Sequence, residues 1–93
     1  MDWKSYDPGW LVELARVQFP QEAWLPAALE RCERAAWQSK SYLAFIERER
    51  ATSRESEWEF GFNLTLRHGD YGELVLDVLR NREIGGIEFL SRL

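Results

Sequence analysis

The side chains that most often do chemistry in enzymes are few in this sequence, and their positions predict structural roles. His68 is the only histidine and lies between two predicted strands, where a turn residue with a solvated imidazole is expected rather than an acid–base group. Cys32 is the only cysteine and lies on an apolar helical stripe, which predicts a packed thiol and not a nucleophile. One histidine, one cysteine and scattered carboxylates match no usual metal-ligand spacing. We therefore expect no catalytic residue, no metal and no cofactor.

Two other patterns are also explained better by structure than by catalysis. Gly85 and Gly86 precede a predicted strand, whereas a phosphate-binding loop leads from a strand into a helix, so these glycines predict a bulge or close packing. Asp77 and Glu88 fall on a predicted open sheet face, where nothing would desolvate two carboxylates and separate their pKa values. The sequence therefore predicts a binding protein and not an enzyme.

The composition predicts one folded domain over residues 1–93 in a reducing compartment. The chain is 45% hydrophobic and 30% charged, which is a globular and not a disordered balance. A lone cysteine cannot form an internal disulfide, and neither an apolar signal core nor a run long enough to cross a bilayer is present, so we expect a cytoplasmic protein. The net charge of -4 argues against nucleic-acid binding and favours a basic protein partner.

Helical spacing dominates the first part of the chain. Asp7 and Pro8 are a helix start signal, and apolar residues at helical spacing predict a helix over about residues 8–17. A second amphipathic helix is expected over about residues 21–38, and Pro26 marks either its start or a kink. Residues 41–48 fit a helix continuation or a buried strand, and we favour the strand.

Strict alternation of apolar and polar residues begins at Glu57 and predicts a half-buried strand. Turn residues near Gly69 and Asn81 then separate two further strands, which gives an antiparallel meander. The predicted pairs are Phe62 with Val78, Leu64 with Leu76, Leu76 with Ile87, and Leu74 with Phe89. The expected fold class is α+β, with a helical layer over about 8–38 packed on one face of a sheet of about three or four strands over 41–91.

This register sorts the side chains of the sheet onto two faces. The face toward the helices is expected to bury Trp58, Phe60, Phe62, Leu64, Leu74, Leu76, Ile87 and Phe89. The opposite face is expected to carry a mixed, solvated set: Glu59, Asn63, Thr65, Glu73, Val75, Asp77, Glu88 and Leu90. Among the five tryptophans, Trp3 and Trp37 are the candidates for exposed binding anchors.

Several segments resemble small bacterial immunity proteins encoded beside polymorphic or contact-dependent toxins. They are residues 19–25 (FPQEAWL), 37–42 (WQSKSY), 56–60 (SEWEF) and 72–79 (GELVLDVL) followed by 84–90 (IGGIEFL). The resemblance implies a cytoplasmic protein that neutralises its cognate toxin domain by forming a tight complex and blocking the active site. A generic adaptor or a regulatory subunit is the alternative function.

The partner-binding surface is proposed from the residue pattern alone. An acidic surface can attract a basic toxin domain by electrostatic steering and then exclude its substrate. The candidate partner-binding residues are Glu57, Glu59, Asp70, Tyr71, Glu73, Asp77 and Glu88.

Overall fold

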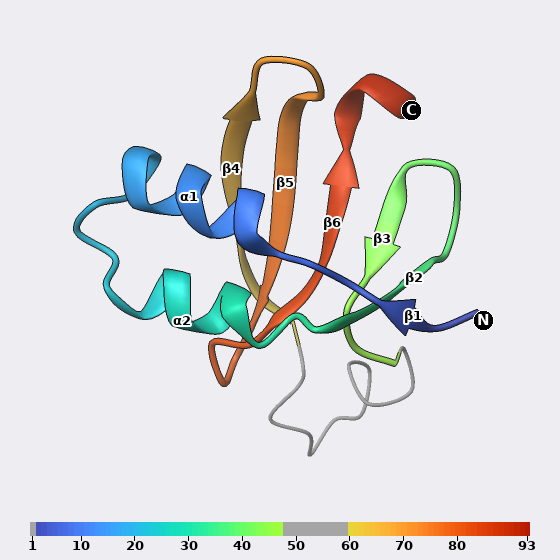
Figure 1. The fold of residues 1–93 in the computed structure, drawn as a ribbon, viewed down its shortest axis with the longest axis horizontal. Coiled ribbons are helices and arrows are strands. Elements are labelled where there is room, and N and C mark those ends of the chain that lie inside the picture. The colour runs from blue at the N-terminus through green and yellow to red at the C-terminus, as the bar shows by residue number, and fades with distance from the viewer. Residues whose placement is uncertain (1, 48–59) are drawn as a thin grey trace.

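The computed structural model describes residues 2–47 and 60–93, which form one antiparallel sheet and two helices (Figure 1). The strand order is β1-β2-β3-β6-β5-β4. In chain order the elements are β1 (Lys4–Ser5), α1 (Gly9–Gln18), α2 (Trp24–Glu30), β2 (Arg34–Trp37), β3 (Tyr42–Ala44), β4 (Phe60–His68), β5 (Gly72–Leu79), β6 (Ile84–Phe89) and the short 3-10 helix η1 (Leu90–Arg92).

The β4–β5–β6 meander has the predicted register. All four predicted pairs are observed: Phe62 with Val78, Leu64 with Leu76, Leu76 with Ile87, and Leu74 with Phe89. The two hairpin turns also fall where glycine, asparagine and aspartate predicted them. Gly72, the first residue of β5, and Arg82 have φ angles of 73° and 66°, in the left-handed region that tight hairpin turns often use.

The predicted second helix over residues 21–38 is wrong in its extent, because α2 ends at Glu30 and residues 34–37 form β2. Alanine-rich residues favour a helix locally, but here pairing with β1 and β3 places them in a sheet. Pro26 lies in the first turn of α2, where it is tolerated, so it marks a helix start and not a kink. The favoured strand over residues 41–48 is confirmed as β3, which is limited to Tyr42–Ala44.

The sheet therefore has six strands and not three or four. The additional strands β1 and β2 extend the sheet beyond β3, on the side away from the meander (Figure 1). Since β1 contains only two residues, it has no period that a sequence pattern could show.

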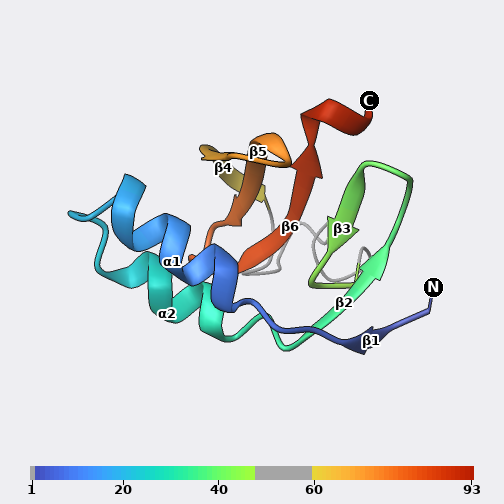
Figure 2. The same ribbon diagram turned by 45° about the horizontal axis from the view of Figure 1, so that its top comes forward.

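Helix α1 starts close to its predicted position. The Asp7 carboxylate accepts a hydrogen bond from the Gly9 N–H at 3.0 Å, and the Pro8 carbonyl accepts from the N–H groups of Leu11 and Val12. The buried residues of α1 are Leu11, Val12 and Ala15, one stripe of an amphipathic helix. This stripe faces the sheet, and both helices lie over its β4, β5 and β6 side (Figure 2).

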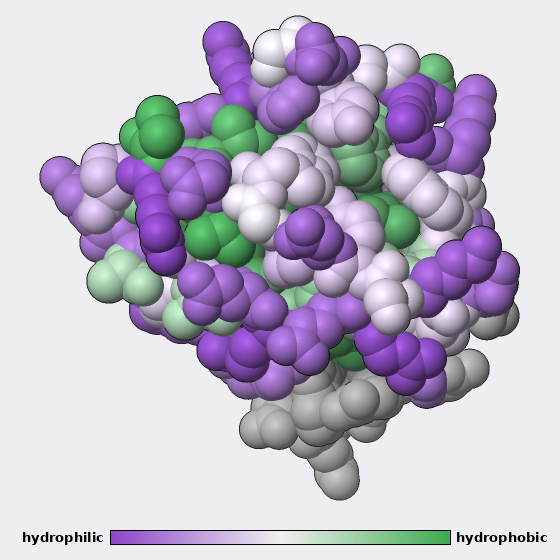
Figure 3. All heavy atoms as spheres, viewed as in Figure 1, coloured by the Kyte–Doolittle hydropathy of each residue, from purple (hydrophilic) through white to green (hydrophobic). Residues whose placement is uncertain are grey.

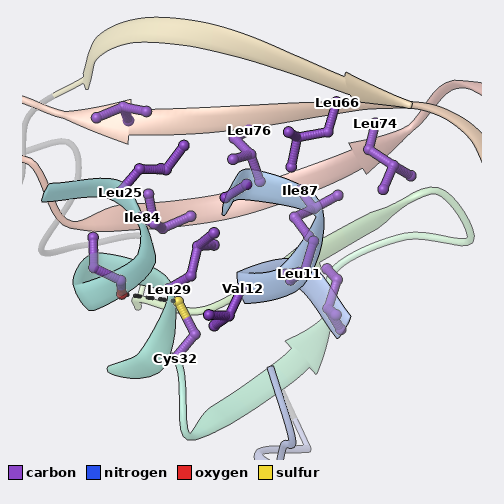
Figure 4. Close-up of a cluster of buried hydrophobic side chains, with 14 of the residues drawn as sticks. Leu11, Val12, Leu25, Leu29, Cys32, Leu66, Leu74, Leu76, Ile84 and Ile87 are labelled. Carbon is purple, nitrogen blue, oxygen red and sulfur yellow. Dashed lines mark hydrogen bonds between the residues drawn. The ribbon is translucent and has the colours of Figure 1, made fainter. Parts of the chain in front are cut away.

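The core between the layers is almost entirely aliphatic (Figure 4). Cys32 lies in it as predicted, with its Sγ donating to the Ala28 carbonyl at 3.7 Å. Burial raises the pKa of this thiol to about 12, so it stays protonated near neutral pH and packs as a small apolar side chain. The largest fully buried side chains are Leu11, Leu25, Leu29, Leu66, Leu74, Leu76, Ile84, Ile87 and Val78.

The predicted burial of the start of β4 is wrong, and the predicted register holds only from Phe62 onward, because the pairing shifts between Phe60 and Phe62. Phe60 is 53% exposed and Phe62 is 42% exposed, because β4 is the last strand in the sheet order. Phe62 has a helix-side neighbour in the Trp24 ring, at 6.1 Å between centroids and nearly perpendicular. Alternation predicted the face to which Phe62 points, but it does not reveal whether another layer covers that face. Trp58, also predicted to be buried, lies outside the described residues.

Candidate interaction surface

The predicted acidic face is only partly an exposed surface. Glu73 is exposed on β5, and its Oε1 lies 3.4 Å from Nη2 of Arg67 on β4. Asp77 and Glu88 are partly buried, so the expectation that they form an open, solvated face is wrong. Asp70 lies in the exposed β4–β5 turn with Tyr71. Glu57 and Glu59 lie outside the described residues.

Asp77 is bound to Tyr42 across the sheet. The Tyr42 hydroxyl donates a hydrogen bond to Asp77 Oδ2 at 2.6 Å and passes over Gly86 on the intervening strand. A Cβ at Gly86 would collide with the Tyr42 ring, which explains why glycine stands there. The Glu88 Oε2 atom is buried and has no hydrogen-bond partner. The contact with Tyr42 makes Asp77 a structural feature of the sheet.

The electrostatics of this cluster follow from its burial. Desolvation raises the pKa of the Asp77 carboxyl; the hydrogen bond from Tyr42 lowers it and the nearby Glu88 charge raises it. Burial, followed by the contact with Asp77, raises the pKa of the Tyr42 hydroxyl above its ordinary value of 10.0. Because Asp77 is held by an internal partner, it is poorly placed to meet another protein.

A second surface is formed by aromatic side chains where the β4–β5 turn, β2 and the end of β6 meet. Trp37 is 48% exposed and Tyr71 is 40% exposed, and both rings contact Phe89, at 5.5 Å and 5.8 Å between centroids. The Arg92 guanidinium lies over both Trp37 and Phe89, at 5.0 Å and 5.2 Å from the ring centroids. We call this set the aromatic end surface: Trp10, Trp37, His68, Tyr71, Phe89 and Arg92.

The turn side of the aromatic end surface is held in place by local hydrogen bonds. His68 Nδ1 accepts the backbone N–H groups of Asp70 and Tyr71, which fixes the turn, and its ring stacks on Tyr71 at 4.6 Å. Ser91 in η1 donates its hydroxyl to the Tyr71 carbonyl at 2.9 Å. His68 is thus the last residue of β4, next to the predicted turn, and its imidazole is half-buried against Trp10 and Tyr71 and not solvated as predicted.

The α1 side of the surface is fixed by Trp10. Its Nε1 donates to the Tyr6 hydroxyl at 3.0 Å, and its ring meets the Tyr71 ring edge-on at 5.4 Å. On the other side, β2 pairing with β3 places Trp37 opposite Leu43, on the helix-facing side of the sheet. Trp37 therefore stands on a strand and Tyr71 on a turn that hydrogen bonds hold in place, so little side-chain freedom is left to lose on binding.

A cavity of about 390 Å³ adjoins Trp37. It is lined by Asp2, Lys4, Ser5, Tyr6, Ala35, Ala36, Trp37 and Leu43. Figure 3 shows that pale, weakly polar side chains and green apolar ones interrupt the purple polar surface on the face viewed in Figure 1. The aromatic end surface thus offers both protruding rings and an adjacent hollow.

The sequence had indicated part of this surface. Trp37 was a candidate anchor and Tyr71 a candidate partner-binding residue, and both are exposed. The second candidate anchor, Trp3, is only partly exposed, beneath the Arg34 guanidinium at 5.9 Å. The sequence did not indicate Arg92 as part of this surface, because its stacking on Trp37 depends on the short helix η1, which no sequence pattern predicted.

Comparison with protein-family models, curated proteins and solved structures found no match. Within residues 2–47 and 60–93, no cluster of three or more histidine, cysteine or acidic side chains is arranged to hold a metal ion. No helix in the same ranges is both long and apolar enough to cross a membrane.

Proposed function

We propose that this chain is a protein-binding domain whose contact surface is the aromatic end surface. The observation that carries the proposal is the exposure of Tyr71 and of Trp37, over which the Arg92 guanidinium lies. Tryptophan, tyrosine and arginine are the residue types that contribute most to the binding energy of protein interfaces. Trp37 and Tyr71 are supported from below by Phe89, so they are held in the rigid, half-buried state typical of such anchors.

The partner that fits the sequence resemblance is a bacterial toxin domain, which the chain neutralises by covering its active site. The net charge of -4 supports attraction of a basic domain over distance, while the aromatic end surface supports the close contact. In this proposal Asp70, beside Tyr71, and Glu73 act mainly in steering, since both are exposed. Asp77 and Glu88 act mainly within the sheet.

The proposal is tested by co-expressing the chain with the protein encoded immediately upstream of its gene. The wild-type chain is expected to restore growth to cells that produce that protein, and Trp37→Ala is expected to fail at the same expression level. Val17→Ala is the control, because Val17 is an apolar residue of α1 that is 76% exposed and is not one of the residues of the aromatic end surface.

Two results would argue against this function. If the wild-type chain neither protects cells nor forms a complex with that protein, a role as an adaptor or regulatory subunit for another partner is favoured. If the chain protects and Trp37→Ala protects equally well, the toxin partner is retained and the contact surface is wrong.

A further inference from the structure

Gln18 forms an unusual contact with the outer edge of β4. Its side-chain Nε2 donates to the Arg67 carbonyl at 2.6 Å, and its Oε1 accepts the Arg67 N–H at 2.8 Å. One primary amide thus satisfies both backbone groups of one residue, as a peptide group of a neighbouring strand would do. The edge of β4 is therefore capable of pairing, and at Arg67 the chain itself supplies the partner.

Every second residue of β4 before Arg67 must also direct its backbone N–H and C=O groups outward, away from β5. In an antiparallel strand, successive residues point their N–H and C=O groups alternately to the two sides, so the outward direction at Arg67 recurs at Thr65 and Asn63. Both residues are exposed. Among residues 2–47 and 60–93, no strand pairs with this side of β4. This part of the edge offers donors and acceptors in strand geometry.

The side chains along this edge favour an extended peptide of alternating character. The exposed Phe62 ring lies on the helix side, and the Trp24 ring beside it is held by its Nε1 hydrogen bond to Glu22 at 2.7 Å. The side chains of Asn63 and Thr65 lie on the other face of the sheet, away from the helices. Natural sheets usually protect such an edge with lysine, proline or a covering element, and β4 contains neither lysine nor proline.

The shape of the molecule favours a single strand over a second copy of this chain. The end of α1, the following turn and the start of α2 reach past β4, as Figures 1 and 2 both show. Two copies joined through their β4 edges by a two-fold axis would place these helical layers on the same face, each projecting over the other copy. An isolated extended segment avoids that collision.

We propose that the outer edge of β4 at Asn63 and Thr65 binds one extended segment of another polypeptide, which becomes an additional antiparallel strand. The segment places apolar side chains against Phe62 and Trp24, and small polar side chains beside Asn63 and Thr65. Backbone pairing provides the attachment, and the alternating side chains select the segment. This edge lies at the far end of the sheet order from β2, which carries Trp37, so the inference does not depend on the proposed function.

The first test measures amide hydrogen exchange in the free protein. The N–H groups of Leu64 and Leu66, which face β5, are expected to be protected, whereas those of Asn63 and Thr65 are expected to exchange freely. Slow exchange at Asn63 and Thr65 in the free monomer would mean that the edge is already occupied, and the proposal would be wrong.

The second test uses a blocked peptide with the sequence of residues 60–66 (FGFNLTL) and lysines added for solubility, because it has the proposed alternation. Its binding is expected to slow amide exchange at Asn63 and Thr65 and to leave Trp37 unaffected. Thr65→Pro removes the outward N–H and is expected to weaken binding by about fivefold or more, whereas Thr65→Val retains the N–H and the affinity. Asn63→Pro replaces Thr65→Pro if the latter lowers the melting temperature.

Equal peptide binding by the proline and valine variants, or peptide contacts confined to other strands, would overturn the proposal. Sedimentation equilibrium tests whether a second copy of this chain occupies the edge of β4 instead. A wild-type dimer that Thr65→Pro converts to a monomer would show that β4 pairs with a second copy, and the proposed single strand would be rejected.

Discussion

The centre of the protein and its aromatic end surface are both apolar, but they are built from different side chains. Among residues 2–47 and 60–93, the largest fully buried side chains are all leucine, isoleucine or valine. The aromatic residues lie at the margin of this core, and Phe89 is the one aromatic residue buried among those described. Aliphatic packing therefore supplies the burial that stabilises the fold, while the larger rings are positioned where a partner can reach them.

This difference explains why exposed rings are compatible with a stable small domain. A ring at the margin rests on the core with one side and keeps the other side accessible, as Trp37 does on Phe89. Truncating such a ring removes contact area for a partner but leaves no internal cavity. Truncating a central leucine does the reverse, so stability and binding are expected to respond to different substitutions.

The largest effect on stability is expected in the centre. Leu76→Ala should lower the free energy of unfolding by about 2 to 5 kcal/mol, because it removes a fully buried side chain and leaves a cavity. Phe62→Ala should cost clearly less, since Phe62 lies at the exposed edge. Urea denaturation of both variants measures the difference, and equal losses would contradict the distinction between centre and margin.

Gly86→Ala is expected to cost about 1 to 3 kcal/mol, because the added methyl group would overlap the Tyr42 ring and force it from Asp77. Gly69→Ala is the control, since nothing lies within 4 Å of the position that its Cβ would occupy. Thermal melting compares the two variants. A Gly86→Ala protein as stable as Gly69→Ala would show that Tyr42 does not pack over β6 as described.

A smaller and pH-dependent effect is expected at Asp77. Tyr42→Phe removes the donor to a partly buried carboxylate and should cost about 1 kcal/mol, while Asp77→Asn keeps an acceptor and should cost less. The pKa of the Asp77 carboxyl is raised in the folded protein. Its contribution to the free energy of unfolding is therefore fully present below the ordinary pKa of 3.8, and it is lost as the pH rises through the raised pKa. Asp77→Asn should remove this part of the pH dependence of unfolding.

That pH dependence is measured by denaturing the wild type and Asp77→Asn from acid to neutral pH. Parallel stability curves for the two proteins would show that Asp77 has the same pKa in the folded and unfolded chains. Such a result would mean that the Asp77 carboxylate is solvated, as the sequence pattern had predicted.

The smallest effect on stability is expected from the exposed acids. Asp70→Lys together with Glu73→Lys should change stability by only about 0.5 kcal/mol, as is usual for surface substitutions. Association with a basic partner should become slower and less sensitive to salt. Surface plasmon resonance at two ionic strengths measures the association rate and its salt dependence. An unchanged association rate would exclude a steering role for Asp70 and Glu73.

The sequence predicted the parts of the fold that local patterns determine. Alternation and turn residues were sufficient for the pairing of Leu64, Leu76 and Ile87, because a slip by one residue would have turned the apolar side chains to the other face. Residues 34–37 were assigned to a helix because their strand depends on β1 and β3, which are distant in the sequence or too short to recognise.

The candidate surface was harder to predict for the same reason. Trp37 was one of two candidates for an exposed ring, because five tryptophans are more than the core requires, but the grouping of Trp37, Tyr71 and Arg92 depends on three separate segments that meet only in the fold. The acidic face was predicted from strand alternation, which gives the direction of a side chain and not its burial. Tyr42 covers Asp77 through a cross-strand contact that alternation does not encode.

The most direct test of the account is a calorimetric titration of the isolated partner domain into wild type, Trp37→Ala and Val17→Ala, with a thermal melt of each. The account predicts that Trp37→Ala loses about 2 kcal/mol or more of binding free energy, with stability within about 1 kcal/mol of wild type. Val17→Ala should bind as the wild type does. Undiminished binding by a folded Trp37→Ala protein would contradict the aromatic end surface as the contact site.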